Sequence, residues 1–192
     1  MRKLIVPFAI AAAAIATPAL AQSASPFTGV RAEGIIGWDR VQNDGGKSGV
    51  AYGFGVGYDT QMSNLVVGLE GEFADSTTKT CARDFAVAGD RLCSRTGRDL
   101  YVGARVGTLL NENTLLYGKA GYTNARFKLA YDDGATGVDD FRVSDNYDGL
   151  RLGAGLEYAI GPNSFVKGEY RYSNYEAGFE KHQVVAGFGF RF

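Results

Sequence analysis

The sequence predicts an all-β fold, an eight-stranded antiparallel up-and-down transmembrane β-barrel. Glycine and aromatic residues are abundant, with 27 Gly, 12 Phe, 11 Tyr and 1 Trp among 192 residues. Eight segments alternate apolar residues with glycine or charged residues at a period of two, which is the pattern of a strand with one face in lipid. The connections between these segments alternate between short and long, as in outer-membrane barrels.

The chain begins with a predicted signal peptide, residues 1–21. Arg2 and Lys3 precede the apolar stretch 4–16, and Ala19 and Ala21 form the small-x-small pattern at which signal peptidase cleaves. The stretch is shorter than the roughly 20 apolar residues that a membrane-spanning helix needs. We therefore expect cleavage after Ala21 and a single barrel domain over residues 22–192.

Charge and composition exclude several classes of protein. Lys plus Arg total 20 and Asp plus Glu total 21, so the chain lacks the basic excess that nucleic-acid binding requires. No segment after the signal peptide approaches 18 consecutive apolar residues, which argues against membrane-spanning helices. We expect no nucleic-acid partner.

The predicted strands follow one another in chain order at 30–39, 50–59, 65–73, 100–107, 116–122, 150–160, 166–172 and 183–192. In 150–160 the leucines share one parity, while Arg151 and Glu157 occupy the other. Two strands are less regular. Ile35 breaks the polarity of the first strand, and the fifth loses its frame near Arg126, at a bulge or above the membrane.

The connections predict which end of the barrel faces outward. Links 60–64, 111–113 and 161–164 are short and rich in turn residues, whereas links 40–49, 75–99, 131–149 and 175–182 are longer. Ten residues tilted by about 40° span about 25 Å, the height of the apolar band. Aromatic residues lie at both predicted rims, toward the long links at Trp38, Phe73 and Tyr172, and toward the short links at Tyr58, Tyr158 and Phe192.

The charged residues occupy one face of the predicted strands, and their positive and negative charges balance, which predicts an interior of paired charges. An eight-stranded barrel is only just wide enough for its own side chains, and buried charges need partners. We therefore expect a lumen plugged by ion pairs, with a narrow or gated pore as the alternative. A lipocalin-like carrier is disfavoured because its apolar face would lie inside. The predicted network comprises Arg31, Glu33, Glu70, Glu72, Arg105, Lys119, Arg151, Glu157, Lys167, Glu169, Arg171 and Arg191, together with Asp39 and Asp59.

The signal peptide, the segment Lys-Gly-Glu-Tyr-Arg-Tyr-Ser at 167–173 and the final Ala-Gly-Phe-Gly-Phe-Arg-Phe at 186–192 carry a family resemblance. The chain resembles the small eight-stranded outer-membrane β-barrel proteins of Gram-negative bacteria, the group of opacity-type porin-like proteins and the OmpA membrane domain. The resemblance implies an outer-membrane location with a periplasmic N-terminus, and contact with outer-membrane lipid and lipopolysaccharide. It also implies that Phe190 and Phe192 are read by the outer-membrane assembly machinery. Because nothing follows Phe192, we expect no peptidoglycan-binding domain.

Cys81 and Cys93 both fall in the long link 75–99. In the oxidising environment beyond the cytoplasm we expect them to form a disulfide that staples this outer loop. A zinc site is disfavoured because no histidine neighbours the two thiols. We expect no bound metal and no cofactor.

The link 131–149 is acidic. A solvated surface loop is the favoured interpretation, because the spacing does not match a calcium-binding loop. Binding of calcium, or of divalent ions that bridge to lipopolysaccharide, stays open. The acidic residues are Asp132, Asp133, Asp139, Asp140, Asp145 and Asp148.

Catalysis is not expected. His182 is the single histidine, and lipid A-modifying barrels pair a histidine with a nearby serine. No serine follows His182 in sequence, although Ser173 or Ser164 on a neighbouring strand stays open as a partner. We expect an envelope protein with a structural and surface-interaction role. By resemblance, its loops would serve adhesion, host contact or haem contact. A narrow channel and a lipid A-modifying enzyme are the alternatives.

Overall fold

A computed structural model describes residues 26–42, 47–77, 79–83, 91–132 and 141–192. The signal peptide and its cleavage residues Ala19 and Ala21 lie outside this described part. The elements of this described part are β1 (Gly29–Gln42), β2 (Lys47–Met62), β3 (Leu65–Ser76), β4 (Lys79–Arg83), β5 (Arg91–Asn111), β6 (Thr114–Asp132), β7 (Phe141–Ala159), β8 (Ser164–Tyr175), the 3-10 turn η1 (Glu176–Gly178) and β9 (Phe179–Arg191).

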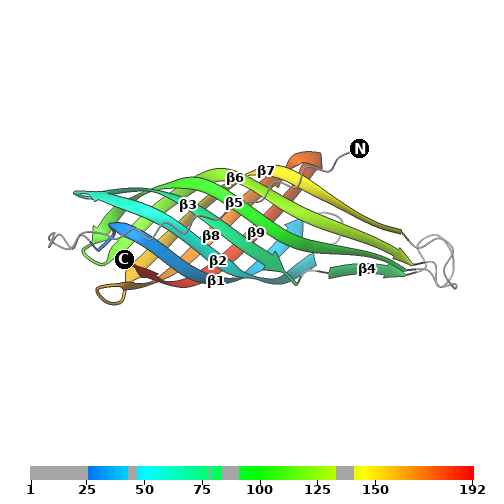
Figure 1. Ribbon diagram of the computed structural model, residues 1–192, viewed down its shortest axis with the longest axis horizontal. Helices are drawn as coiled ribbons and strands as arrows, with labels where there is room; N and C mark the ends of the chain where they lie inside the picture. Colours follow the sequence, from blue (N-terminus) through cyan, green and yellow to red (C-terminus); the bar gives the residue numbers. More distant parts are fainter. Residues whose placement is uncertain (1–25, 43–46, 78, 84–90, 133–140) are drawn as a thin grey trace, which may run out of the picture.

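Eight of these strands close into a barrel. Each pairs antiparallel with its neighbours in the order β3-β2-β1-β9-β8-β7-β6-β5, and β3 pairs with β5 to complete the circle. The ninth strand, β4, pairs with β5 beyond the end of β3. The predicted eight-stranded antiparallel barrel is therefore confirmed (Figure 1). Among the described residues, no helix has the length and apolarity to cross a bilayer.

Within the barrel, the described side chains alternate between the lumen and the outer wall along the strands. In β8, for example, alternate residues from Phe165 to Tyr175 are buried. The outer wall is a belt of exposed apolar side chains that includes Ile36, Trp38, Phe54, Val56, Tyr58, Leu69, Val102, Val106, Leu116, Leu150, Leu152, Leu156, Val184 and Phe188. A soluble protein would not leave such a patch uncovered.

Two irregular segments resolve differently from the prediction. Ile35 keeps the alternation, because it faces the lumen and packs with Ala74 and Val185. Ala125 on β6 is buried and has the same parity as the other inward-facing residues of β6, so the alternation continues up to this residue. The irregularity opposite Arg126 lies on β5, where the register shifts between Thr96 and Asp99. The bulge is therefore on the strand beside the predicted one.

The strands on the long-link side are longer than predicted. β5 has 21 residues and β6 and β7 have 19 each, and together with β4 they project from one end of the barrel (Figure 1). Links 75–99 and 131–149 are therefore partly strand rather than loop. Backbone hydrogen bonding continues past the membrane because pairing satisfies N–H and C=O groups in water as well as in lipid.

Glycines on the lumen face make room for large neighbours. A Cβ on Gly103 would lie 2.2 Å from the hydroxyl oxygen of Tyr101, and one on Gly121 would lie 2.9 Å from the same ring. Tyr101 is only 3% exposed and occupies this space inside the barrel. The high glycine content thus accompanies a lumen filled by long side chains.

Candidate functional site

The lumen contains every charged residue that the sequence assigned to it. All of the fourteen side chains are buried, and each forms at least one ion pair with another inward-facing residue. The inward side chains come from all eight barrel strands. Ion pairs connect them from the short-turn end of the lumen to the long-link end.

The layer nearest the short turns is a closed ring, which we call the inner ring and define as Asp59, Arg105, Glu157 and Arg191. These residues lie on β2, β5, β7 and β9, which are alternate strands around the barrel. Arg105 lies 2.6 Å from Asp59 and 2.8 Å from Glu157. Arg191 lies 3.0 Å from Asp59 and 2.7 Å from Glu157. Each charge therefore bridges two opposite charges, and the ring crosses the lumen.

An apolar layer lies against the inner ring. Phe27, just before β1, is fully buried and packs with Val66, Leu115 and Tyr117. The guanidinium of Arg191 lies 5.3 Å from the centre of the Phe27 ring and donates to the carbonyl oxygen of Pro26 at 2.7 Å. The segment before β1 thus closes the short-turn end of the barrel. Nothing in the alternation of the strands identified this contribution of Phe27.

The middle layer is centred on Lys119. Its Nζ lies 2.8 Å from a carboxylate oxygen of each of Glu70, Glu72 and Glu169. These acids come from β3 and β8, on either side of β6. Glu169 also accepts a hydrogen bond from the hydroxyl of Tyr117 at 2.6 Å.

The outer layer includes two charges that the sequence analysis placed in loops. Asp99 lies 2.6 Å from Arg151 and 3.2 Å from Lys181. Lys181 also lies 3.6 Å from Asp39. Both missed residues are in phase with the inward parity of their strands, since Asp99 precedes buried Tyr101 by two and Lys181 precedes buried Val185 by four. Extending the alternation beyond the predicted strand ends would have found them.

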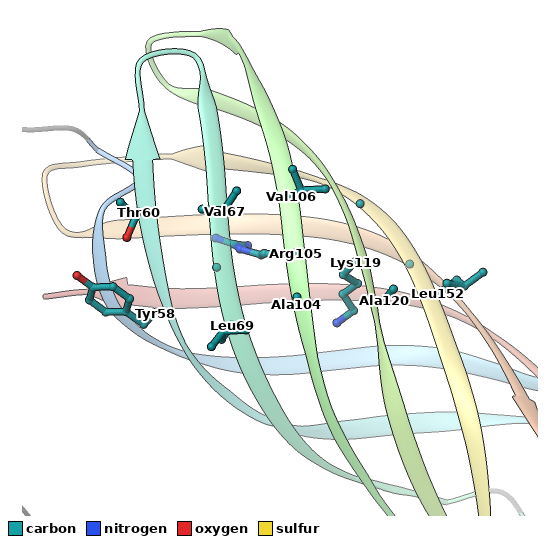
Figure 2. A pocket seen from close by; sticks show the side chains of 13 residues that line it. Tyr58, Thr60, Val67, Leu69, Ala104, Arg105, Val106, Lys119, Ala120 and Leu152 are labelled. Carbon is teal, nitrogen blue, oxygen red and sulfur yellow. The ribbon is translucent and has the colours of Figure 1, made fainter.

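The outer wall carries a hollow of about 820 Å³ between β2, β3, β5, β6 and β7 (Figure 2). The register places Leu69, Ala104, Ala120 and Leu152 in one row across four strands. The small alanines lie between the two larger leucines, so the wall is recessed there. Its lining is mostly apolar and also includes Thr60, Arg105 and Lys119, whereas the lumen behind it is lined by charged side chains.

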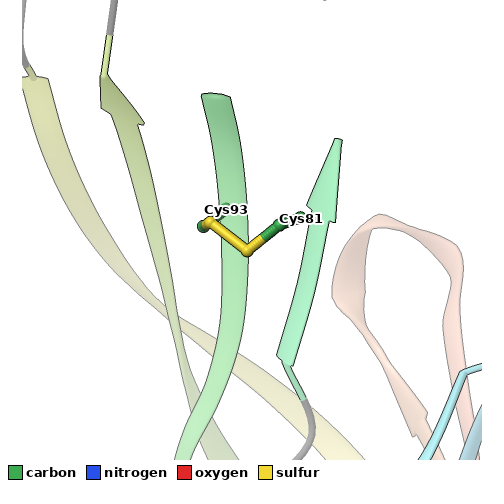
Figure 3. The surroundings of a disulfide bond; sticks show 2 residues. All are labelled: Cys81 and Cys93. Atoms are coloured by element: carbon green, nitrogen blue, oxygen red, sulfur yellow. A yellow bond between two sulfur atoms is a disulfide. The ribbon is translucent and has the colours of Figure 1, made fainter. Parts of the chain in front are cut away.

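Cys81 and Cys93 form a disulfide, as predicted (Figure 3). Its setting differs from the prediction, because the two residues are direct partners in the β4–β5 pairing and not members of an irregular loop. Their Cα atoms are 4.1 Å apart. The bond therefore joins β4 to β5 in the part of the sheet that projects beyond β3.

The acidic link is partly strand. Asp145 and Asp148 lie on β7, whereas 133–140, with Asp133, Asp139 and Asp140, lies outside the described residues. Asp148 accepts hydrogen bonds from the hydroxyl of Tyr122 and, at 2.6 Å, from the side-chain amide of Asn124. The Tyr122 bond, followed by that of Asn124, holds the pKa of Asp148 below its usual range. No group of three or more metal-ligating residues occurs within the part of the chain that the structure describes.

His182 and the candidate serines do not meet. His182 faces the outer wall and its Nδ1 lies 2.7 Å from the hydroxyl oxygen of Tyr170. Ser173 is fully buried in the lumen, where its hydroxyl accepts from Arg151 at 2.9 Å. Ser164 begins β8 at the short-turn end and pairs with Phe190. The histidine–serine arrangement considered from the sequence is therefore wrong for both serines.

The terminal aromatic residues lie on the outer wall. Phe190 is 49% exposed and Phe192 is 76% exposed, and the ring of Phe190 contacts that of Phe188 at 5.1 Å between centroids. Their predicted role as an assembly signal stays a prediction.

Comparison with known proteins places these features in a family. The family model described as "Outer membrane protein beta-barrel domain" matches residues 9–192. The 25 kDa outer-membrane immunogenic protein of Brucella ovis is 30% identical over 136 residues, which are 71% of this chain and 60% of that protein. The 22 kDa outer membrane protein of Rhizobium leguminosarum bv. viciae is 28% identical over 170 residues, covering 78% of this chain and 71% of that protein. The match to the Brucella ovis protein thus spans less than two thirds of that protein's length.

Solved structures show the same architecture. Ail, the attachment invasion locus protein of Yersinia pestis, superimposes with a TM-score of 0.57 at 23% identity, over 86% of this chain and 99% of Ail. Neisserial surface protein A gives a TM-score of 0.52 at 15% identity, over 86% of this chain and 98% of that protein. At these identities the likeness concerns the fold. The barrel, its apolar outer wall and the family match together show that the chain belongs to the outer membrane protein beta-barrel domain family and resides in the outer membrane.

Proposed function

We propose that this outer-membrane protein is a non-conducting anchor that holds an extracellular sheet at the cell surface. The inner ring carries the proposal, because its four charges link alternate strands around the circumference and bridge each other across the lumen. The apolar layer around Phe27 lies against it. An ion would have to displace paired charges at both the inner ring and the middle layer, at a high desolvation cost.

Planar-bilayer recording tests the closed lumen. We expect the purified wild-type protein to give no discrete conductance steps. A variant with Phe27, Arg105, Lys119 and Arg191 all replaced by alanine removes the apolar layer, both cations of the inner ring and the central cation of the middle layer, and it should give steps if it folds. Folding is checked by the different migration of boiled and unboiled samples on a detergent gel. Discrete steps from the wild type would overturn the proposal, whatever the variant does.

The surface role is supported by the projecting part of β4, β5, β6 and β7, which extends the sheet beyond the other strands. Ail of Yersinia pestis, with the same fold, has been crystallised with the heparin analogue sucrose octasulfate. We expect cells displaying this chain to adhere to immobilised heparin, and cells with residues 78–96 deleted to adhere less while keeping a heat-modifiable barrel. Equal adhesion of the two would contradict the surface role of this extension.

A further inference from the structure

Arg40 is an exposed cation on the outer wall of the barrel. It lies on β1 two residues beyond Trp38, and its register partner on β9 is His182. Asp39, which precedes Arg40, and Lys181, which precedes His182, face the lumen instead. Within the described part of the chain, no hydrogen bond or ion pair engages the Arg40 guanidinium. A charge in this position is available to a group that approaches from the membrane side.

His182 provides a second polar group beside Arg40. The hydroxyl oxygen of Tyr170 lies 2.7 Å from Nδ1 of His182, and the centre of the Tyr172 ring lies 5.2 Å from the centre of the imidazole. No other described residue bonds to its Nε2. When Tyr170 donates to Nδ1, Nε2 carries the proton of the neutral ring and is a donor. The nearby carboxylate of Glu180 already accepts a hydrogen bond from the hydroxyl of Tyr172 at 2.9 Å.

The outer wall next to Arg40 and His182, on the side of the apolar belt, is apolar. Trp38 and Val184 are register partners, and they are 61% and 62% exposed. An unpaired cation and a ring N–H thus lie at the edge of the belt, where polar residues replace apolar ones. A ligand that contacts both the polar pair and the apolar surface beside it has an anionic head group and an apolar tail. A free anion would use the head contacts alone.

We infer that Arg40 and His182 form a binding site for the phosphate of an outer-leaflet membrane lipid, with an acyl chain against Trp38 and Val184. Arg40 pairs with the phosphate, and the Nε2–H of His182 donates to one of its oxygens. Tyr170 and Tyr172 hold the imidazole in place. The site lies outside the barrel and does not depend on whether the lumen conducts.

The chain's single tryptophan makes the site directly measurable. Trp38 fluorescence is quenched by brominated acyl chains that contact it. The protein is reconstituted into phosphatidylcholine vesicles that contain either brominated phosphatidic acid or brominated phosphatidylcholine. One interfacial cation contributes about 1 kcal/mol of attraction to anionic lipid, so we expect half-quenching at an about fivefold lower fraction of the phosphatidic acid.

Matched variants assign the preference to the site. Arg40→Gln should abolish it and His182→Gln should reduce it, whereas Arg126→Gln should keep it. Arg126 is the control because it also lies on the outer wall, and it is engaged by Asn146 at 3.2 Å. Heat-modifiable migration confirms that each variant folds. Equal quenching by both lipids in the wild type, or an unchanged preference in Arg40→Gln, would refute the site.

Inorganic phosphate separates a lipid site from an anion site. Added to the vesicles at the same concentration as the brominated phosphatidic acid, it should leave the quenching unchanged, because it lacks the acyl contact with Trp38. Full reversal of the preference by inorganic phosphate would show a site for the free anion, and the lipid assignment would be wrong.

Discussion

Arg171 and Glu72 join opposite walls of the barrel, with Nη2 of the arginine 2.8 Å from Oε1 of the glutamate. Arg171 lies on β8 and Glu72 on β3, and four steps around the eight-stranded circle separate these strands. Glu72 also lies 2.8 Å from Nζ of Lys119. One carboxylate therefore neutralises cations from two other strands, and the interior depends on it.

Replacing Glu72 by glutamine should strongly destabilise the folded barrel. The substitution keeps the size of the side chain and leaves Arg171 and Lys119 without this shared anion. Breaking a buried ion pair in this way costs about 3–5 kcal/mol. The free energy of unfolding is measured by urea titration in micelles, with the unboiled gel migration as the folded signal. Glu112→Gln, at an exposed turn position, serves as the control and should change it by less than about 0.5 kcal/mol.

The double variant Glu72→Gln with Arg171→Gln tests whether the pair acts as a unit. Because removing both charges leaves less uncompensated charge, the double variant should be less destabilised than the sum of the two single variants. Strict additivity would show that the two groups do not interact in the membrane-embedded protein.

An arginine on the outer wall should destabilise according to its depth. Leu69 lies within β3 and is 70% exposed on the apolar belt. Leu69→Arg should cost about 2–4 kcal/mol on folding into phospholipid vesicles. Met62, at the end of β2 beside the turn, is 52% exposed, and Met62→Arg should cost about 0–1 kcal/mol. Equal costs at the two positions would contradict this placement of the belt.

Two glycines with opposite surroundings test the packing of the lumen. A Cβ on Gly121 would lie 2.2 Å from the carbonyl oxygen of Val102 and 2.4 Å from the Cα of Gly103, so Gly121→Ala requires a backbone shift. Gly34 has no heavy atom within 4 Å of such a Cβ. We expect Gly121→Ala to reduce the heat-modifiable fraction and Gly34→Ala to leave it unchanged. The interpretation fails if the two variants assemble equally well.

The alternation of residues predicted the barrel because a membrane protein separates its two faces more sharply than a soluble one. Arg151 is charged and faces the lumen, whereas its neighbour Leu152 is apolar and faces the lipid. Because the two environments differ so strongly, the alternation of polarity is enough to assign each residue to a face. At the long-link end, the strands continue beyond the residues at which this contrast predicts that they end. Asp99 and Lys181 lie where the outer wall has become polar, and there the contrast that marks a strand disappears although the pairing continues.

Apolar residues inside the lumen were harder to predict. Ile35 and Phe27 are buried among other apolar side chains, which polarity cannot distinguish from residues that face lipid. The pairing of Lys119 with acids from two other strands also depends on the register around the whole circle. Each strand gives only its own parity, and the closure that brings three acids to one lysine is a property of all eight strands.

The disulfide should stabilise the projecting sheet without stabilising the barrel. Cys81 and Cys93 join β4 to β5, and among the described strands β4 pairs with β5 alone. Closing a loop of this size contributes about 3 kcal/mol at most in the loop-entropy model, and that contribution acts on β4 and its connection to β5. Replacing both cysteines by serine should therefore leave the urea midpoint of the barrel unchanged. The variant should be cut faster by trypsin at Arg83 and Arg91, which gel analysis of the folded protein would resolve. A lower barrel midpoint in the variant would show that the extension and the barrel unfold together.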